Sequence, residues 1–441
     1  MFKRIAALLT VPMLLSAQQP TPEPRLITLD EAVRLAQQNS PSAMQARGTL
    51  RTRALAVRSA YSAFLPTLNG SVGLGRPLEA PARGPRQWSH SSSISSSLTL
   101  FDPLRYYDVG EAKRNVDVAE AAEIQNRYSV ALQVKQQYFN ALNARESEAA
   151  ARSALAVAEQ SYRAAVARVR AGSATTSDSL RALIQVGNQQ IAVLTAQNNL
   201  RQANVGLSRL VGTDFPVQAD PADTLDRAAE AAIDSASLVL MVDRGPVLEQ
   251  QRAQLELARY GVKSARTRYW PRISSVNISR SGNGIGFYGF DDHKFDRRPT
   301  AEDPNGVDAY SYSTQCCNVS VSMTFWDNFA RENQLVASRI QVENAEANLR
   351  DQELGQQQSL AQWIGTLRTT QAQMAVQRLS LAAAEEDLRV QQRRYQLGAS
   401  TFLDVLNSQV TLNQARFALI QARFDARVAK AQIETLTGKD M

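Results

Sequence analysis

Histidine and cysteine are nearly absent from this 441-residue chain, which contains two of each. Cys316 and Cys317 are adjacent, so the sequence has neither a CxxC metal site nor a disulfide framework. Neighbouring strand residues point to opposite faces, so we interpret the pair as two unpaired strand residues. His90 and His293 are predicted to lie in loops. Because no acid, base and nucleophile recur in one predicted cleft, we expect no catalytic, metal or cofactor site, and no enzyme.

Helix-breaking residues and aromatic residues are also scarce. The chain has 21 glycines and 16 prolines, and 7% of its residues are aromatic. Its abundant Ala, Leu, Arg and Gln favour long helices. An apolar fraction of 44% with 21% charged residues excludes a disordered chain. The formal net charge of +7 is spread along the sequence, so we predict no nucleic-acid-binding patch.

Long hydrophobic runs are missing as well. Lys3 and Arg4 precede the apolar run 5–15, and small residues follow it, so residues 1–17 are predicted to be a secretory signal peptide. The run is too short to span a bilayer as a helix. No cysteine lies near the predicted cleavage point, so we expect no lipid anchor. Any membrane crossing by the rest of the chain must therefore use β-strands.

The chain contains an internal duplication. Residues 172–212 resemble residues 398–438 at a constant offset of 226 positions, and both segments begin and end on glycine. Upstream, Pro41 and Pro66 recur as Pro246 and Pro271 at an offset of 205. The predicted domains after the signal peptide are a first repeat (18–212), an inter-repeat or equatorial segment (213–245), a second repeat (246–438) and a C-terminal tail (439–441).

Each repeat has the same predicted order of elements. A short helix, which begins in the first repeat with a Thr28–Glu31 capping box, precedes a helix of about 25 residues that ends at a proline. Two strands follow, and then a very long helix and a return helix with heptad packing. The long helices are predicted over residues 104–171 and 328–397. Turns at 170–175 and 396–401, called the tips below, join them to the return helices.

The strands are predicted from alternation of apolar with Ser, Asn or Thr residues, which places β-hairpins at 66–101 and 272–325. The first strand of the second hairpin, around Val276 and Ile278, is expected to be short. A glycine-rich run at Gly282, Gly284, Gly286 and Gly289 lacks the following helix that a dinucleotide loop needs. The polar segment 290–306 after it is predicted to be a long extracellular loop. The clearest alternation predicts a lipid-facing strand that carries Val319, Val321, Met323 and Phe325. A soluble hairpin packed on one face gives the same period, so both interpretations stand.

Four segments carry a resemblance to a known family. They are 28-TLDEAVRLAQQNSP-41, 65-LP-66, 101-FD-102 and 394-RYQLGASTFLDVLNSQ-409. Together with the duplication they resemble the TolC family of outer-membrane efflux factors. The resemblance implies a mainly α fold with a β-barrel part. Tandem-duplicated helical hairpins would form a trimeric α-barrel tunnel in the periplasm, and four strands per chain would form a shared 12-stranded transmembrane β-barrel.

The resemblance also implies function, localisation and partners. The chain would be the outer-membrane exit duct of a tripartite efflux or type I secretion system in a Gram-negative bacterium. It would passively conduct substrate delivered by an inner-membrane pump and a periplasmic adaptor, or membrane fusion protein. The expected partners are two further copies, the adaptor, the pump and outer-membrane lipid, without nucleic acid. The alternative is a soluble periplasmic coiled-coil scaffold without a pore, and fractionation with outer membranes separates the two.

The same resemblance implies two functional groups. Residues at the tips match adaptor-docking turns: Arg170, Ala171, Gly172, Ser173, Gln396, Leu397, Gly398 and Ala399. Residues just beyond the tips match a periplasmic gate: Ser177, Asp178, Tyr395, Ser400, Asp404 and Asn407. Family gates can carry Arg where Ser400 stands and a second Asp where Asn407 stands. Glycine at the tips and Asp in the first helical turn are also ordinary helix caps, so capping remains a second interpretation of both groups.

Overall fold

The computed structural model describes residues 25–75, 89–213, 215–220, 222, 235–273, 276–285, 310–318 and 321–439. The predicted signal peptide lies outside this part. The chain forms two compact units, and each combines segments from both repeats. Unit 1 comprises residues 1–40, 130–231 and 366–431, and unit 2 comprises 41–129, 232–365 and 432–441. No helix in the described ranges is long and apolar enough to cross a membrane.

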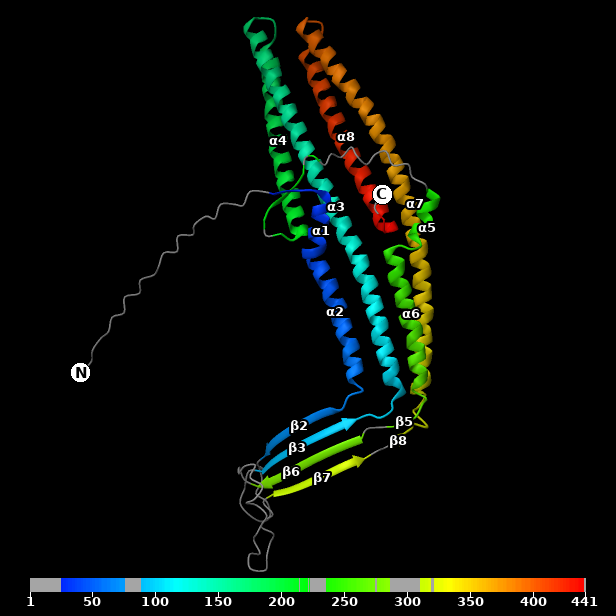
Figure 1. Cartoon of the computed structure of the whole chain (residues 1–441). Helices are drawn as coiled ribbons and strands as arrows, with labels where there is room; N and C mark the ends of the chain where they lie inside the picture. Colours follow the sequence, from blue (N-terminus) through cyan, green and yellow to red (C-terminus); the bar gives the residue numbers. More distant parts are fainter. Residues whose placement is uncertain are drawn as a thin grey trace, which may run out of the picture. The chain divides into compact units, whose positions relative to one another are not determined.

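The helices repeat as the duplication predicts (Figure 1). Helices α2 (Pro41–Ser62) and α6 (Pro246–Thr267) have 22 residues each. The return helices α4 (Thr176–Val211) and α8 (Phe402–Thr437) have 36 residues each. The long helices α3 (Pro103–Arg170) and α7 (Ala330–Gln396) have 68 and 67 residues. The predicted order of helices in the two repeats is therefore confirmed.

Unit 1 contains two helical hairpins. The C-terminal part of α3 packs with α4, and the C-terminal part of α7 packs with α8 (Figure 1). The Gln409 side chain of α8 donates a 2.8 Å hydrogen bond to the Ser161 hydroxyl of α3. The Ser408 hydroxyl of α8 donates to the Asp387 carboxylate of α7. These contacts place α8 between α7 and α3, so the two hairpins form one layer in the order α7, α8, α3, α4.

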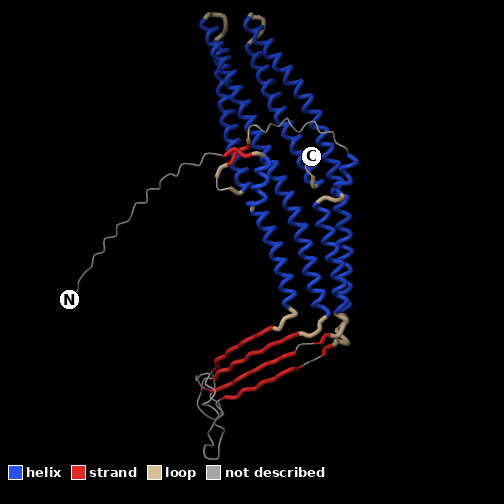
Figure 2. The backbone as a smooth tube through the Cα atoms, in the orientation of Figure 1, coloured by secondary structure: helices blue, strands red, loops and turns tan. Residues whose placement is uncertain are grey.

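A small parallel sheet and a short helix complete unit 1 (Figure 2). Strand β1 (Arg25–Ile27) pairs with β4 (Val217–Ala219), and helix α1 (Leu29–Asn39) follows β1. The Thr28 hydroxyl caps α1 by accepting from the Glu31 amide, whereas the Glu31 carboxylate forms an ion pair with Arg25. The Thr28 half of the predicted capping box is therefore present, and the Glu31 carboxylate binds Arg25 instead of closing the box. The sheet itself was not predicted from the sequence.

The core of unit 1 is centred on Tyr138. Its side chain is fully buried, and its hydroxyl donates to the Ile27 carbonyl and accepts from the Asp220 amide. A buried tyrosine hydroxyl with two partners fixes a single packing arrangement, since losing either partner leaves a polar group unpaired. The apolar residues around it come from α1, α3, α4, β1 and β4. They include Ile27, Val134, Leu142, Leu207, Val211 and Val217.

Unit 2 contains helix α2, helix α5 (Ser235–Val242), helix α6, the first parts of α3 and α7, and a four-stranded antiparallel sheet. The sheet order is β2 (Thr67–Gly75), β3 (Ser89–Leu98), β6 (Val276–Ile285) and β7 (Tyr310–Asn318) (Figure 1). The register places Leu68, Val72 and Ile94 on one face. The other face carries hydroxyl pairs, such as Ser71 with Ser93 at 2.7 Å. The predicted alternation of the first hairpin is thus confirmed.

The predicted lipid-facing strand is wrong in its position. Strand β7 ends at Asn318, and Val319 lies outside the described residues. Val321 belongs to the short strand β8 (Val321–Ser322), which pairs with β5 (Arg272–Ile273) outside the four-stranded sheet. Met323 and Phe325 follow β8 and lie in no strand. Alternation alone does not determine which residues pair with a neighbouring strand. The hydrogen-bonded ladder with β6 places β7 upstream of the predicted strand.

Two further predictions are wrong, the short length of the strand around Val276 and the loop position of His90, while the predicted loop 290–306 lies outside the described residues. Gly282 and Gly284 lie in β6, which has 10 residues rather than a few, while Gly286 and Gly289 lie outside the described residues. His90 lies in β3, and His293 lies outside the described part. Glycine weakens a strand because it loses more backbone entropy on folding than other residues do. Pairing with a strand on each side, Ser92 and Tyr312 in the case of Gly282, outweighs that cost.

Candidate functional site

The two tips of unit 1 end their long helices in the same way. After α3, Gly172 has φ 68° and its amide donates to the Val169 carbonyl, while the Ser173 amide donates to the Arg168 carbonyl. After α7, Gly398 has φ 75° and the equivalent amides donate to the Tyr395 and Arg394 carbonyls. This pair of bonds is the Schellman motif, which needs a left-handed residue and so favours glycine. Capping by both glycines is therefore observed.

The tips are also open surfaces. Leu397 is 84% exposed, although leucine is among the residues most often buried. Arg170, Ala171, Gly172 and Ser173, and Gln396, Gly398 and Ala399 on the other tip, are not buried either. Each tip thus presents an exposed turn that a left-handed glycine caps.

Asp404 lies in the first turn of α8 and accepts three hydrogen bonds on one oxygen. The Thr401 hydroxyl, the Thr401 amide and the Ser400 hydroxyl reach Oδ2 at 2.7, 2.9 and 2.9 Å. These donors, the Thr401 hydroxyl first, lower the pKa of the exposed Asp404 carboxyl. In the described residues Oδ1 has no hydrogen-bond partner. Asp404 is thus a helix cap that keeps its charge and one free oxygen.

Asp178 is its counterpart at the start of α4. The Thr175 amide and hydroxyl donate to its Oδ2 at 3.3 and 3.0 Å. The nearest guanidinium, that of Arg181, is 4.0 Å from Oδ1. Both return helices therefore begin with the same threonine–aspartate cap. Ser177 and Asn407, also predicted gate residues, are exposed beside these caps.

Tyr395 joins the two hairpins near the tips. Its ring packs against Phe402 at 5.7 Å between centroids, and the Arg168 guanidinium lies 4.2 Å from its ring centre. Arg168 also donates a 2.5 Å hydrogen bond to the Tyr395 carbonyl at the end of α7, as a second donor beside the Gly398 amide. A cation is favoured at a helix C-terminus, so Arg168 of α3 stabilises the end of α7.

Arg168 is the residue of this site that the sequence does not reveal. The chain has many arginines, and nothing in the spacing around position 168 distinguishes this one. Its role depends on a contact with the other hairpin, which only the fold provides. It supplies a cation beside Tyr395, although position 400 is serine.

The Tyr395 hydroxyl is buried and has no hydrogen-bond partner in the described part of the chain. Burial raises the pKa of this phenol, and the neighbouring Asp178 carboxylate raises it further. The phenol therefore stays neutral at physiological pH. A buried donor without an acceptor costs free energy.

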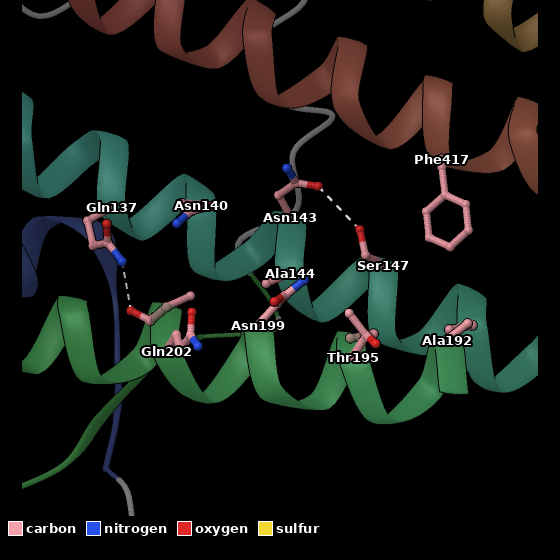
Figure 3. A pocket seen from close by; sticks show the side chains of 13 residues that line it. Gln137, Asn140, Asn143, Ala144, Ser147, Ala192, Thr195, Asn199, Gln202 and Phe417 are labelled. Atoms are coloured by element: carbon pink, nitrogen blue, oxygen red, sulfur yellow. Dashed lines mark hydrogen bonds between the residues drawn. The ribbon is translucent and has the colours of Figure 1, made fainter. Parts of the chain in front are cut away.

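The helix layer of unit 1 also has an amide-lined cavity of about 640 Å³ (Figure 3). Its lining comes from α3 and α4, with Phe417 of α8 at one end, and contains no charged side chain. Amides and hydroxyls dominate it, among them Gln137, Asn140, Ser147, Thr195, Asn199 and Gln202. Such a wall interacts with water and with neutral polar solutes without a strong preference for either charge.

Comparison with known proteins places these features in a family context. The family model described as outer membrane efflux protein matches residues 32–213 and 239–439. The outer membrane efflux protein BepC of Brucella suis is 23% identical over 440 residues, which cover 99% of this chain and 91% of BepC.

Solved structures agree with this match. The channel protein CusC superposes with a TM-score of 0.72 at 18% identity, over 100% of this chain and 99% of CusC. The open-state outer membrane channel MtrE of Neisseria gonorrhoeae superposes with a TM-score of 0.71 at 18% identity, over 93% of this chain and 89% of MtrE.

Proposed function

The chain belongs to the outer membrane efflux protein family, and on that premise we propose that three copies assemble into an exit duct whose tips bind an adaptor and whose constriction is a gate. Membership confirms the TolC-type fold, the outer-membrane location in a Gram-negative bacterium and the efflux-channel function, rather than a scaffold without a pore. The family is one of channel proteins, whose members are trimers that work with an adaptor and an inner-membrane pump.

The proposal of a trimer rests on the exposed apolar residues of α4, which form a second apolar face beside the buried one. Val186 and Val193 of α4 are buried, whereas Leu180, Ile184 and Ile191 are 56%, 65% and 64% exposed. The exposed residues follow heptad spacing, which continues through Leu194 to Val205. A large exposed apolar face at this spacing indicates a further helix partner.

The partner helix is available on the other edge of the layer. On α7, Val376, Leu379 and Val390 are 59%, 75% and 40% exposed at related spacing. Because α4 and α7 are the two outer helices of the layer, α4 of one copy packs on α7 of the next, and three copies close a ring. A second copy of the chain is the partner because each chain supplies one exposed apolar face on α4 and another on α7.

The four-stranded sheet supports the same assembly. Strands β2 and β7 are its edges, and each has one strand neighbour in the described sheet. An unpaired strand edge is not tolerated in lipid. The apolar face also needs lipid, since Leu68 and Val72 are 75% and 78% exposed in the single chain. Pairing β2 of one copy with β7 of the next resolves the edges.

The tips support adaptor docking. Both turns have the same capped geometry, and Leu397 supplies an exposed apolar side chain at one of them. The gate is proposed at Ser177, Asp178, Tyr395, Ser400, Asp404 and Asn407, with Arg168 as an additional member. Its support is the cross-hairpin contact between Arg168 and Tyr395, which holds the two tips of one chain together.

Disulfide crosslinking tests the assembly. Leu180 and Val390 each lie eight positions from the glycine of their tip, so they are expected at the same height in neighbouring copies. Leu180→Cys with Val390→Cys, in a chain whose Cys316 and Cys317 are replaced by serine, should give covalent trimers on denaturing gels. Val186→Cys with Val390→Cys is the matched control, because Val186 is buried in the chain itself. Equal crosslinking of both pairs, or none, would contradict the proposed ring.

A further inference from the structure

Exposed aromatic side chains surround the junctions between the helices of unit 2 and their strands. Each of the four junctions carries at least one: Tyr61 before β2, Phe101 after β3, Tyr269 and Trp270 after α6, and Phe325, Trp326 and Phe329 before α7. Trp270, Trp326 and Phe325 are 63%, 67% and 86% exposed. Trp and Tyr concentrate where a membrane protein meets the headgroups of the bilayer. These junctions therefore mark the periplasmic interface of the outer membrane.

A basic groove lies next to this interface, between α6 and α7. Its cavity of about 380 Å³ is within the size range of small-ligand sites. Arg259, Lys263 and Arg266 line it from α6 at positions i, i+4 and i+7, which share one helix face. Arg339 lines it from α7, with Glu343 as the one acidic side chain of the lining. Arg266 is four residues from Trp270, so one end of the groove lies about 6 Å along the chain from the aromatic side chains.

The charge of the groove is not neutralised within the chain. Arg259 is bound by the Glu346 and Glu256 carboxylates at 2.9 and 3.1 Å. Lys263, Arg266 and Arg339 have no acidic partner among the residues that the structure describes. Arg266, in the last turn of α6, is favoured by the helix dipole, but that explanation does not extend to Lys263 or Arg339. Three free bases around a groove are complementary to an anion.

We propose that this groove binds the phosphate headgroup of an anionic phospholipid in the periplasmic leaflet of the outer membrane. The acyl chains would extend toward the aromatic side chains and the apolar face of the sheet. Val262 and Val342, which also line the groove, suit the carbon atoms that adjoin the phosphate. Basic pockets beside a membrane interface are a recurring mode of lipid recognition. The bound lipid would fix how deeply the helices of unit 2 approach the membrane.

Native mass spectrometry of the intact, detergent-purified protein tests the proposal. The protein is mixed with equal amounts of phosphatidylglycerol and phosphatidylethanolamine, and the retained lipids are counted. We expect the wild type to retain phosphatidylglycerol preferentially. One base beside an anionic headgroup is worth about fivefold in affinity. The triple variant Lys263→Gln, Arg266→Gln, Arg339→Gln should therefore lose at least about tenfold in phosphatidylglycerol retention.

Two further variants control for charge and folding. Lys263→Arg with Arg266→Lys and Arg339→Lys keeps the charges and should retain phosphatidylglycerol. Arg209→Gln with Arg350→Gln and Arg368→Gln removes the same charge from exposed positions outside the groove and should behave as the wild type. Equal retention of the two lipids by the wild type, or an equal loss in both glutamine triples, would overturn the proposal.

A last arm separates lipid from free phosphate. Sodium phosphate and sodium chloride at equal ionic strength should displace phosphatidylglycerol equally, because salt screens the headgroup attraction in both cases. If phosphate displaces the lipid much more effectively than chloride, the groove is a site for free phosphate, and the assignment to a phospholipid is wrong.

Discussion

Arg168 shows at the scale of one residue how the two hairpins depend on each other. Its carbonyl accepts the Ser173 amide of its own tip. Its guanidinium donates to the Tyr395 carbonyl, which also accepts the Gly398 amide of the other tip. Arg168 thus takes part in the hydrogen bonding of both tips. Any separation of the hairpins at this point must break a charge-assisted hydrogen bond and a cation–π contact.

Arg168→Ala should therefore favour the open gate. A hydrogen bond from a charged group and a cation–π contact together are worth roughly 2 kcal/mol, or about thirtyfold in the ratio of open to closed channels. The measurement is the resting conductance of the purified protein in planar bilayers. Arg168→Lys should open the channel almost as much, because lysine lacks the planar group that both stacks and donates.

Arg163→Ala is the control for that experiment. Arg163 is also on α3, but its partner is Glu159 of the same helix, so its loss should leave the conductance unchanged. A resting conductance that is the same in the wild type and Arg168→Ala would contradict the proposed role of Arg168 in the gate. Absence of any conductance in the wild type would instead question the proposed assembly.

At the scale of elements, each tip is both a helix cap and the proposed docking surface for the adaptor. Gly398→Val should strain the left-handed turn by roughly 1 kcal/mol or more, because a β-branched residue is disfavoured at positive φ. We expect a folded trimer with less adaptor bound, measured by crosslinking to the adaptor. Gly355→Val within α7, where the glycine φ is not positive and nothing lies within 4 Å, is the control. Unchanged crosslinking in tip variants of both hairpins would contradict docking at the tips.

The sheet carries the second prediction at this scale. Val72→Arg should block insertion far more than Ser71→Arg, because the two side chains of β2 point to opposite faces. An arginine on the lipid face near mid-bilayer costs roughly 2–4 kcal/mol. The readout is the amount of trimer in the outer-membrane fraction. If both variants assemble equally well, the apolar face of β2 does not contact lipid.

The elements differ in how far the sequence predicts them. Glycine at both tips, proline at the start of α2 and α6, and the constant repeat offset define the helices, because each is a local signal that occurs twice. Strand β6 was underestimated, since Gly282 and Gly284 depend on neighbours on both sides. The pairing of β1 with β4 joins segments of three residues nearly 200 positions apart, and such short strands carry no periodic signal.

The residues of the candidate site also differ in how far the sequence predicts their contacts. The caps at Asp178 and Asp404 follow from local sequence, since threonine three residues before an acid is a capping signal. The contact of Arg168 with Tyr395 is tertiary and has no such signal. The strand that carries Val321 lies at a different position from the predicted one, because alternation does not determine register. Roles as gate and docking residues remain predictions, because they depend on copies and partners outside the single chain.

At the scale of the whole molecule, a trimer multiplies each charge at the constriction by three. Three copies of Asp178 and Asp404 would place up to six carboxylates near one axis. Capping occupies only Oδ2 of Asp404, and the pKa of this carboxyl is lowered by the Thr401 and Ser400 donors. Capping therefore leaves Oδ1 available for the proposed gate. We expect the Asp404 carboxylates of such a ring to stay ionised, although like charges in a ring oppose ionisation.

We therefore predict that the reconstituted channel is cation-selective and that Asp404→Asn reduces this selectivity, because carboxylate rings attract cations. Asparagine keeps an oxygen for the cap and removes the charge. The measurement is the reversal potential across a salt gradient in planar bilayers, with Asp117→Asn on α3 as the control for an exposed acid elsewhere. Block by multivalent cations from the helical side should weaken in Asp404→Asn, and should be weaker in the wild type than in relatives with a second Asp at the position of Asn407.

The pH dependence provides an independent check. A lowered pKa in the folded chain means that Asp404 stays charged as the pH falls from 7 to 5, so the selectivity should persist over that range. The stabilising effect of its cap is complete above the unfolded pKa near 4 and is lost as the pH falls through the lower folded value. Selectivity and tip stability should therefore decline together below about pH 4. An unchanged reversal potential in Asp404→Asn would mean that these carboxylates face away from the lumen and serve only as helix caps.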